Sequence, residues 1–293
     1  AFKYMVCLDF QEVLDDAGGQ YARLAARLAG RGVPSIAAAL QAMLEPLEEP
    51  EPAAAKSEPE RVARTSGVLL HLTSLPGRFG IGDLGDAAYR FVGFLAAAGQ
   101  QVWQIMPLGP TSYGDSPYQA LSALAGNPLL INLERLIDDR CLAPWDLDTA
   151  PRFPEDRVDY GAVINFKQRM LRLAYDNYKR NASETLRTGL AEFVAANRWW
   201  LDDYTLFAAL KEAHGGASWS TWEQDIATHQ PTALEHWRDV LSDQVHYHEY
   251  VQFTFDRQWT ALKAYANEQG ISIMGDVPIY VAYDSADAWA HPG

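Results

Sequence analysis

Basic residues are scarce in this chain. It has 24 Lys and Arg against 38 Asp and Glu, so its formal net charge at pH 7 is -14. Nucleic acids and acidic membrane surfaces are bound by clustered Lys and Arg, and the sequence contains no such cluster. No apolar run approaches the roughly 18 residues that a membrane span needs, and no secretory signal pattern is found. We therefore expect a neutral or cationic ligand, with neither a nucleic acid nor a membrane as partner.

Cysteine is nearly absent as well. Cys7 and Cys141 are the only two cysteines and stand far apart, which favours reduced thiols in a cytoplasmic protein over a disulfide framework. The zinc motif His-Glu-x-x-His does not occur. His246 and His248 are close in sequence, but positions i and i+2 of a helix face different directions. The sequence therefore predicts no metal site.

Residues 80–85, Gly-Ile-Gly-Asp-Leu-Gly, match the dinucleotide-binding pattern Gly-x-Gly-x-x-Gly. That pattern requires a strand directly before the first glycine and an acidic residue about twenty positions later. Residues 73–79 intervene here, and the expected acidic position falls among glutamines and Trp103. The segment is better explained as a loop in which glycine permits a close approach of chain or ligand.

The composition divides the chain into three parts. Residues 46–62 are acidic and rich in proline and cannot bury apolar area, so they predict an extended linker. Residues 1–45 carry apolar residues at helical spacing, interrupted by glycines and Pro34, and predict a small helical segment of unknown role. Residues 63–293 form the main domain.

Strand and helix patterns alternate at the start of the main domain. Residues 67–72 and 102–106 are apolar runs of strand length, and a helical pattern at 86–98 separates them. We expect Asp86 as the N-cap of this helix and Gly99 as its C-cap. The order strand, helix, strand predicts parallel strands joined by a right-handed crossover.

A long, mainly helical section follows, at about residues 121–269, and its clearest helix spans 231–267. A third strand pattern occurs at residues 271–277. Polar residues at the carboxyl ends of parallel strands fit a (β/α)8 barrel, in which catalysis takes place on that face. We therefore predict an α/β fold, a partial (β/α)8 TIM barrel with a large helical insertion.

Two tyrosines stand on the loop after the second strand. Tyr113 and Tyr118 lie within residues 109–119, a segment rich in glycine, proline and serine, where ligand contact is favoured over core packing. Asp276 follows the third strand and would face the same mouth of the barrel. Four tryptophans of the helical section allow either sugar stacking or core packing. They are Trp199, Trp200, Trp219 and Trp222.

Several blocks of the main domain together resemble the 4-α-glucanotransferases of glycoside hydrolase family 77, also called amylomaltases or disproportionating enzymes. The resemblance covers about residues 66–293, with the blocks in the family's order. Leu121 and Leu124 depart from it, because an aromatic residue is common at that place. The blocks are Gly67-Val-Leu-Leu-His-Leu-Thr-Ser-Leu-Pro76, Gly80-Ile-Gly-Asp-Leu-Gly85, Trp103-Gln-Ile-Met-Pro-Leu-Gly-Pro110, Asp115-Ser-Pro-Tyr-Gln119, Ala125-Gly-Asn-Pro-Leu-Leu-Ile131 and Gly275-Asp-Val-Pro-Ile-Tyr-Val281.

The resemblance implies an enzyme that transfers α-1,4-glucan segments between maltooligosaccharides by a retaining mechanism, without a cofactor or an essential metal. It implies that Tyr118 contacts the sugar near the cleavage point and that Ser116 and Gln119 line the same subsites. Tyr113 would lie on the glucan path at the rim. Asp276 would support the site without performing the cleavage.

The family's Arg-x-Asp-His nucleophile motif and its later acid/base Glu do not occur in this sequence. We therefore expect the chain to be the N-terminal part of such an enzyme and to be inactive alone, and we assign no nucleophile. Two alternatives stay open: a glucan-binding protein that lacks the chemistry, and a hydrolase of the α-amylase type.

Overall fold

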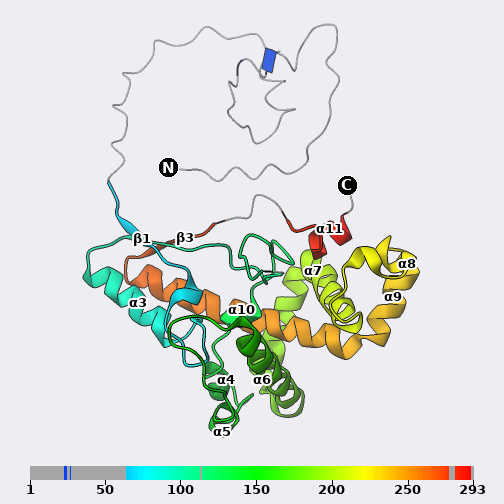
Figure 1. Cartoon of the computed structure of the whole chain (residues 1–293), viewed down its shortest axis with the longest axis horizontal. Coiled ribbons are helices and arrows are strands. Elements are labelled where there is room, and N and C mark those ends of the chain that lie inside the picture. The colour runs from blue at the N-terminus through cyan, green and yellow to red at the C-terminus, as the bar shows by residue number, and fades with distance from the viewer. Residues whose placement is uncertain (1–22, 25–26, 28–63, 113, 277–280, 292–293) are drawn as a thin grey trace. The chain divides into compact units, whose positions relative to one another are not determined.

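A computed structural model describes residues 23–24, 27, 64–112, 114–276 and 281–291 (Figure 1). The chain divides into two units, residues 1–64 and 65–293. The small helical segment and the linker expected before residue 63 lie almost entirely outside the described residues. None of the helices in the described ranges combines the length and the apolarity needed to cross a lipid bilayer.

The second unit contains a three-stranded parallel sheet. Its strands β1 (Gly67–Leu69), β2 (Val102–Gln104) and β3 (Ser272–Met274) lie in the order β1-β2-β3. Both pairs are parallel, with Val68, Trp103 and Ile273 in register across the sheet. Helix α3 (Asp86–Ala97) connects β1 to β2, which confirms the predicted strand-helix-strand unit.

The two faces of this sheet differ in burial. Trp103 has no exposed surface and packs in a core that includes Val92 and Leu95 of α3. On the opposite face, Leu69 is 54% exposed and Met274 is 42% exposed. One face of the sheet is therefore buried and the other is exposed among the residues that the structure describes.

The remaining helices form the section between β2 and β3 and the end of the described chain. Helix α10 (Ser242–Glu268) contacts α3 and β3 near one end and packs against α6 and α7 (Figure 1). The elements are η2 (Pro128–Leu130), α4 (Arg135–Asp138), α5 (Pro144–Leu147), α6 (Tyr160–Asn181), α7 (Glu184–Ala213), η3 (Trp219–Thr221), α8 (Gln224–Ala227), α9 (Pro231–Val240), α10 (Ser242–Glu268) and α11 (Ala286–Ala290), with the short η1 (Leu72–Ser74) after β1.

Three expectations about helix boundaries are wrong. The helix expected over residues 231–267 is interrupted at Leu241, where φ is -103° and ψ is 22°, so α9 ends and α10 begins there. Leu241 itself is buried, and the apolar stripe therefore continues across the break. In α3 the N-cap is Gly85, and Asp86 is the first helical residue. Gly99, with φ of 69°, follows the C-cap Ala98 and allows the chain to leave the helix.

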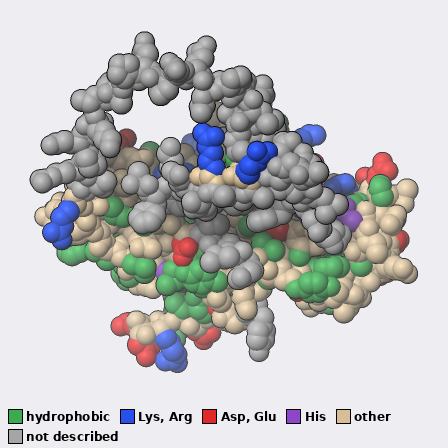
Figure 2. All heavy atoms as spheres, turned by 90° about the horizontal axis from the view of Figure 1, so that it is seen from above, with side chains coloured by type: hydrophobic (Ala, Val, Ile, Leu, Met, Phe, Trp, Pro, Cys, Tyr) green, Lys and Arg blue, Asp and Glu red, His purple; other side chains and the backbone are tan. Residues whose placement is uncertain are grey.

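The helical section has a hydrophobic core of its own. Phe207 of α7, Trp222 and Trp289 of α11 pack together, with ring centroids 5.6–5.9 Å apart. Trp222 is thus a core residue, whereas Trp199 is 71% exposed on α7. Figure 2 shows one face of the molecule, on which the coloured Lys and Arg side chains stand in small separate groups with hydrophobic side chains exposed between them.

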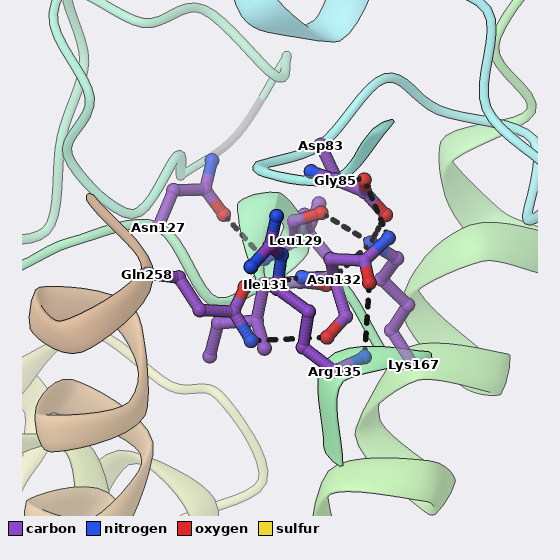
Figure 3. Close-up of polar contacts among 9 residues, drawn as sticks. All are labelled: Asp83, Gly85, Asn127, Leu129, Ile131, Asn132, Arg135, Lys167 and Gln258. Carbon is purple, nitrogen blue, oxygen red and sulfur yellow. Dashed lines mark hydrogen bonds and ion pairs between the residues drawn. The ribbon is translucent and has the colours of Figure 1, made fainter. Parts of the chain in front are cut away.

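Lys167 of α6 is buried and uses its ammonium group to hold three chain segments together. Its Nζ donates to Asp83 Oδ2 at 3.2 Å, to the Leu129 carbonyl at 2.7 Å and to the Ile131 carbonyl at 2.9 Å (Figure 3). Burial lowers the pKa of Lys167, and the charge of Asp83 opposes that shift. All three donors of the ammonium are therefore paired, as a buried charge requires.

Two glutamines of α10 fix the same segment from the other side. Gln252 accepts from the Gly126 amide at 2.7 Å and donates to the Gly126 carbonyl at 2.9 Å. Gln258 makes the equivalent pair with Asn132, at 2.8 and 3.0 Å (Figure 3). Residues 126–132 are thereby clamped at both ends, which gives the adjoining loop a fixed attachment.

The glycine-rich segment 77–85 allows close packing of the chain on itself. A Cβ at Gly82 would overlap the carbonyl oxygens of Leu72 and Leu75, which belong to the backbone and cannot rotate away. We expect Gly82→Ala to reduce the free energy of unfolding by about 1–3 kcal/mol through overpacking. The measurement is urea unfolding followed by circular dichroism.

Gly93, inside α3, is the matched control for this prediction. A Cβ at that position meets no atom within 4 Å. Gly93→Ala should therefore stabilise the protein by about 0.5–1 kcal/mol, since alanine is the better helix former. Equal effects of the two substitutions would contradict the packing argument.

Candidate functional site

The loop after β2 is a closed turn that presents its tip to solvent. Thr111 and Ala120 form an antiparallel bridge, and the Ser112 amide donates to the Gln119 carbonyl at 3.0 Å. Gly114 and Asp115 have φ of 81° and 55°, which reverses the chain between them. The local sequence dictates this shape, because glycine and aspartate tolerate the left-handed region better than other residues.

Tyr118 and Asp276 lie in direct contact, although 158 positions separate them. The Tyr118 hydroxyl donates to Asp276 Oδ2 at 2.6 Å. Tyr118 is 47% exposed, so its ring remains available to a ligand. The hydrogen bond to Asp276 raises the pKa of Tyr118. The loop after β2 and the end of β3 therefore meet at one place, as their positions at carboxyl ends of parallel strands predict.

The other candidates occupy the same loop in different ways. Ser116 is half-buried, and its Oγ accepts from the Tyr118 amide at 3.3 Å, so it shapes the turn that carries the phenol. Gln119 is exposed, and its backbone amide donates to the Ser116 carbonyl at 3.1 Å. Tyr113 lies outside the described residues.

A cavity of about 220 Å³ lies beside this loop and contains a residue that the sequence analysis missed. His71 lines it together with Thr111, Asp115 and Tyr160. His71 stands two residues after the end of β1. The available signal was a polar residue inside an apolar run that was expected to be strand throughout. Burial lowers the pKa of His71, which keeps its ring neutral at pH 7.

The lowered pKa of His71 predicts a pH dependence of stability. Below about pH 6.5 the unfolded chain binds a proton on this histidine that the folded chain does not, so the free energy of unfolding falls as the pH falls. One such proton contributes up to about 1.4 kcal/mol per pH unit. His71→Gln should reduce that slope between pH 6.5 and 5.5.

The slope is measured from urea unfolding curves recorded at several pH values. Burial also lowers the pKa of His229, so some slope should persist in the variant. Identical slopes in the variant and the parent protein would contradict the assignment to His71.

A larger cavity, of about 580 Å³, opens among α6, α7 and α10. Thr111 and Leu121 form its boundary with the loop, and neither cavity has Tyr118 or Asp276 among its lining residues. We place the candidate site at the smaller cavity and the phenol-carboxylate pair, since those elements converge at the strand ends.

No group of three or more His, Cys, Asp or Glu side chains in the described ranges is arranged to hold a metal ion. His248 instead approaches Glu212 at 3.2 Å, and His246 contacts Ser242 at 3.4 Å. Cys141 is a buried free thiol. The chemistry offered by the site is therefore an exposed phenol ring, a hydrogen-bonded carboxylate and polar loop groups, which suit a neutral polyhydroxylated ligand.

Comparison with known proteins identifies the family of this chain. The family model of 4-alpha-glucanotransferase matches residues 70–293. The 4-alpha-glucanotransferase of Synechocystis sp. is 54% identical over 229 residues, which are 78% of this chain and 45% of that protein. The enzyme of the same name from Thermus thermophilus is 48% identical, with the same coverage.

A solved structure is similar as well. The amylomaltase from Streptococcus agalactiae, in complex with acarbose, superimposes with a TM-score of 0.75 at 40% identity, over 78% of this chain and 46% of that chain. This chain spans less than half the length of these relatives. With the family model covering most of the sequence, the chain belongs to the 4-alpha-glucanotransferase family.

Proposed function

We propose that this chain is part of a 4-α-glucanotransferase that moves α-1,4-glucan segments between maltooligosaccharides. The observation that carries the proposal is the contact of Tyr118 with Asp276 at the carboxyl ends of the parallel strands. Family membership supports the reaction class. The acarbose complex of the Streptococcus agalactiae amylomaltase supports a glucan-like ligand.

The fold proposal is a partial (β/α)8 barrel with a helical insertion at about residues 121–269. The exposed face of the sheet supports it, because Leu69 and Met274 would point into a barrel completed by further strands. The length of the relatives supports it too, since this chain corresponds to less than half of each. The acidic composition and the two cysteines support a cytosolic enzyme without nucleic-acid partners.

In the proposed reaction a carboxylate attacks the anomeric carbon, and a carboxylic acid protonates the leaving oxygen. An acceptor 4-hydroxyl then attacks the anomeric carbon of the glycosyl-enzyme, the bond to the enzyme carboxylate breaks, and the acid/base residue takes up the hydroxyl proton. Retaining carboxylate pairs of this kind stand about 5–5.5 Å apart. The chain supplies neither member of the pair, so its proposed contribution is binding: Tyr118 contacts the sugar, and Asp276 fixes the phenol and supports the site.

Transfer requires that an acceptor sugar, and not water, reaches the intermediate. The aromatic loop would favour this by apolar contact with pyranose faces and by exclusion of water. Ser116 and Gln119 would line the same subsites, and Tyr113 would lie on the glucan path at the rim. The reaction needs no cofactor and no essential metal.

Incubation of the full-length protein with maltotriose tests the proposal. Glucose together with a ladder of longer oligosaccharides supports transfer. Glucose with maltose alone identifies a hydrolase, and an unchanged substrate that nevertheless binds identifies a glucan-binding protein. The 293-residue chain alone should show no turnover, because the nucleophile motif and the acid/base Glu are absent from its sequence.

A further inference from the structure

An aromatic pair stands on the surface where the helical section meets the segment after β3. The rings of Trp219, on η3, and Tyr283 have centroids 5.0 Å apart and an interplanar angle of 36°. Trp219 Nε1 donates to the Tyr283 carbonyl at 2.7 Å. Tyr283 is 68% exposed. Trp219 is one of the four tryptophans whose positions in the sequence allow sugar stacking, and Tyr283 is its aromatic partner in the structure.

A partly buried ion pair holds these two aromatic residues in place. Asp284 accepts from the Trp219 amide at 3.3 Å and pairs with Lys211 of α7. Lys211 also donates to the Ala217 carbonyl at 3.2 Å. Only 16% of the Lys211 side chain is exposed. The ion pair fixes the backbone around the two rings. The tyrosine ring can therefore keep its position while it stays exposed to solvent.

Two hydrogen bonds connect the segment that carries Tyr283 to the chain just after the loop of Tyr118. The Ala286 amide donates to the Leu121 carbonyl at 2.8 Å, which ties the segment after β3 to the loop after β2. A second tie runs from the Ala123 amide to Asp287 at 3.0 Å. Tyr283 lies three residues before Ala286, and Tyr118 lies three residues before Leu121. Three residues of chain span at most about 11 Å, so each tyrosine backbone lies within that distance of the residue that makes the hydrogen bond.

Isolated exposed aromatic residues are common and need no function. Trp145 and Trp199 are such residues, each 71% exposed on a helix. Tyr283 differs in three respects: it is paired with a second ring, it is braced by an ion pair, and it is tied to the loop of the candidate site. Pyranose rings pack their C–H faces on such surfaces by apolar contact.

We propose that Trp219 and Tyr283 form an outer sugar-binding platform, which holds glucose units of a maltooligosaccharide that extend beyond Tyr118. The proposal rests on the proposed function, since it extends the same glucan path. A platform of this kind acts on substrate length: it helps long chains that reach it more than short chains that do not. Tyr283 is then a specificity-determining residue.

The test compares maltoheptaose with maltotriose in the full-length protein and its Tyr283→Ala variant. The ratio of kcat/KM for maltoheptaose to kcat/KM for maltotriose should fall about three- to tenfold in the variant, as expected for the loss of one aromatic contact. Tyr283→Phe should keep the ratio within about twofold. Trp145→Ala, which removes an exposed tryptophan on α5, is the matched control.

An unchanged ratio in Tyr283→Ala would overturn the proposal, as would an equal loss for both substrates with a lowered melting temperature. Isothermal titration with maltoheptaose separates this inference from the proposed function. Weaker binding by Tyr283→Ala in a protein that transfers no glucan would retain the platform and reject the transferase. Normal transfer with unaffected maltoheptaose binding would retain the transferase and reject the platform.

Discussion

Replacement of Lys167 by methionine is expected to reduce the free energy of unfolding by about 3–5 kcal/mol. The substitution leaves the Asp83 carboxylate buried without its cation and removes the donor to the carbonyls of Leu129 and Ile131. Breaking a buried ion pair by removing one partner has an effect of this size. Methionine has a similar length and no charge, so the loss reports the ammonium group and not a cavity.

Urea unfolding measures this effect, and two further variants give it meaning. Lys263→Met, at an exposed position of α10, should change stability by less than about 0.5 kcal/mol. The double variant Asp83→Asn with Lys167→Met should be more stable than Lys167→Met alone, because no uncompensated carboxylate remains. A Lys167→Met protein as stable as the Lys263→Met control would refute the structural role of this lysine.

The contact between Tyr118 and Asp276 predicts the second large effect, on the proposed transfer activity of the full-length protein. Asp276→Asn should reduce kcat for maltotriose by about 100-fold, because a preorganised charged partner at the site is lost. Tyr118→Phe keeps the stacking ring and removes one hydrogen bond to a charged group, and should cost about tenfold. The products are followed by chromatography of the oligosaccharide ladder.

If the two residues act as one unit, the losses will not add. The double variant should be no slower than Asp276→Asn alone, within about twofold. Tyr265→Phe is the control, because this partly buried tyrosine near the end of α10 precedes β3 and lies away from its carboxyl end. Multiplicative losses in the double variant would show that the 2.6 Å contact has no functional coupling.

The sequence allowed the strand positions and the meeting of two site residues to be predicted. The starts of β1 and β2 were recognisable as apolar runs, although the strands end at Leu69 and Gln104, earlier than the expected residues 72 and 106. Parallel pairing brings their carboxyl ends to one edge. The same rule located Asp276 relative to Tyr118. This part of the site could be inferred because it depends on the order of elements and not on packing details.

The remaining features depend on long-range packing that no local pattern reveals. The break between α9 and α10 at Leu241 could not be seen in the sequence, because Leu241 is itself buried and continues the apolar stripe of both helices. Lys167 and Gln252 look like solvent-facing residues in the sequence, yet both are buried and bind backbone groups. Trp219 had no visible partner, since Tyr283 lies 64 positions further on.

Helix α10 is attached both to the chain that follows the loop of Tyr118 and to the strand that precedes Asp276. Near the middle of α10, Gln252 makes two hydrogen bonds with the backbone of Gly126, a few residues beyond the loop of Tyr118. At its far end the chain turns into β3 and reaches Asp276. Helix α10 therefore helps to set the spacing between the Tyr118 hydroxyl and the Asp276 carboxylate, and a small rotation of this helix would lengthen or shorten their contact without any change in the two residues themselves.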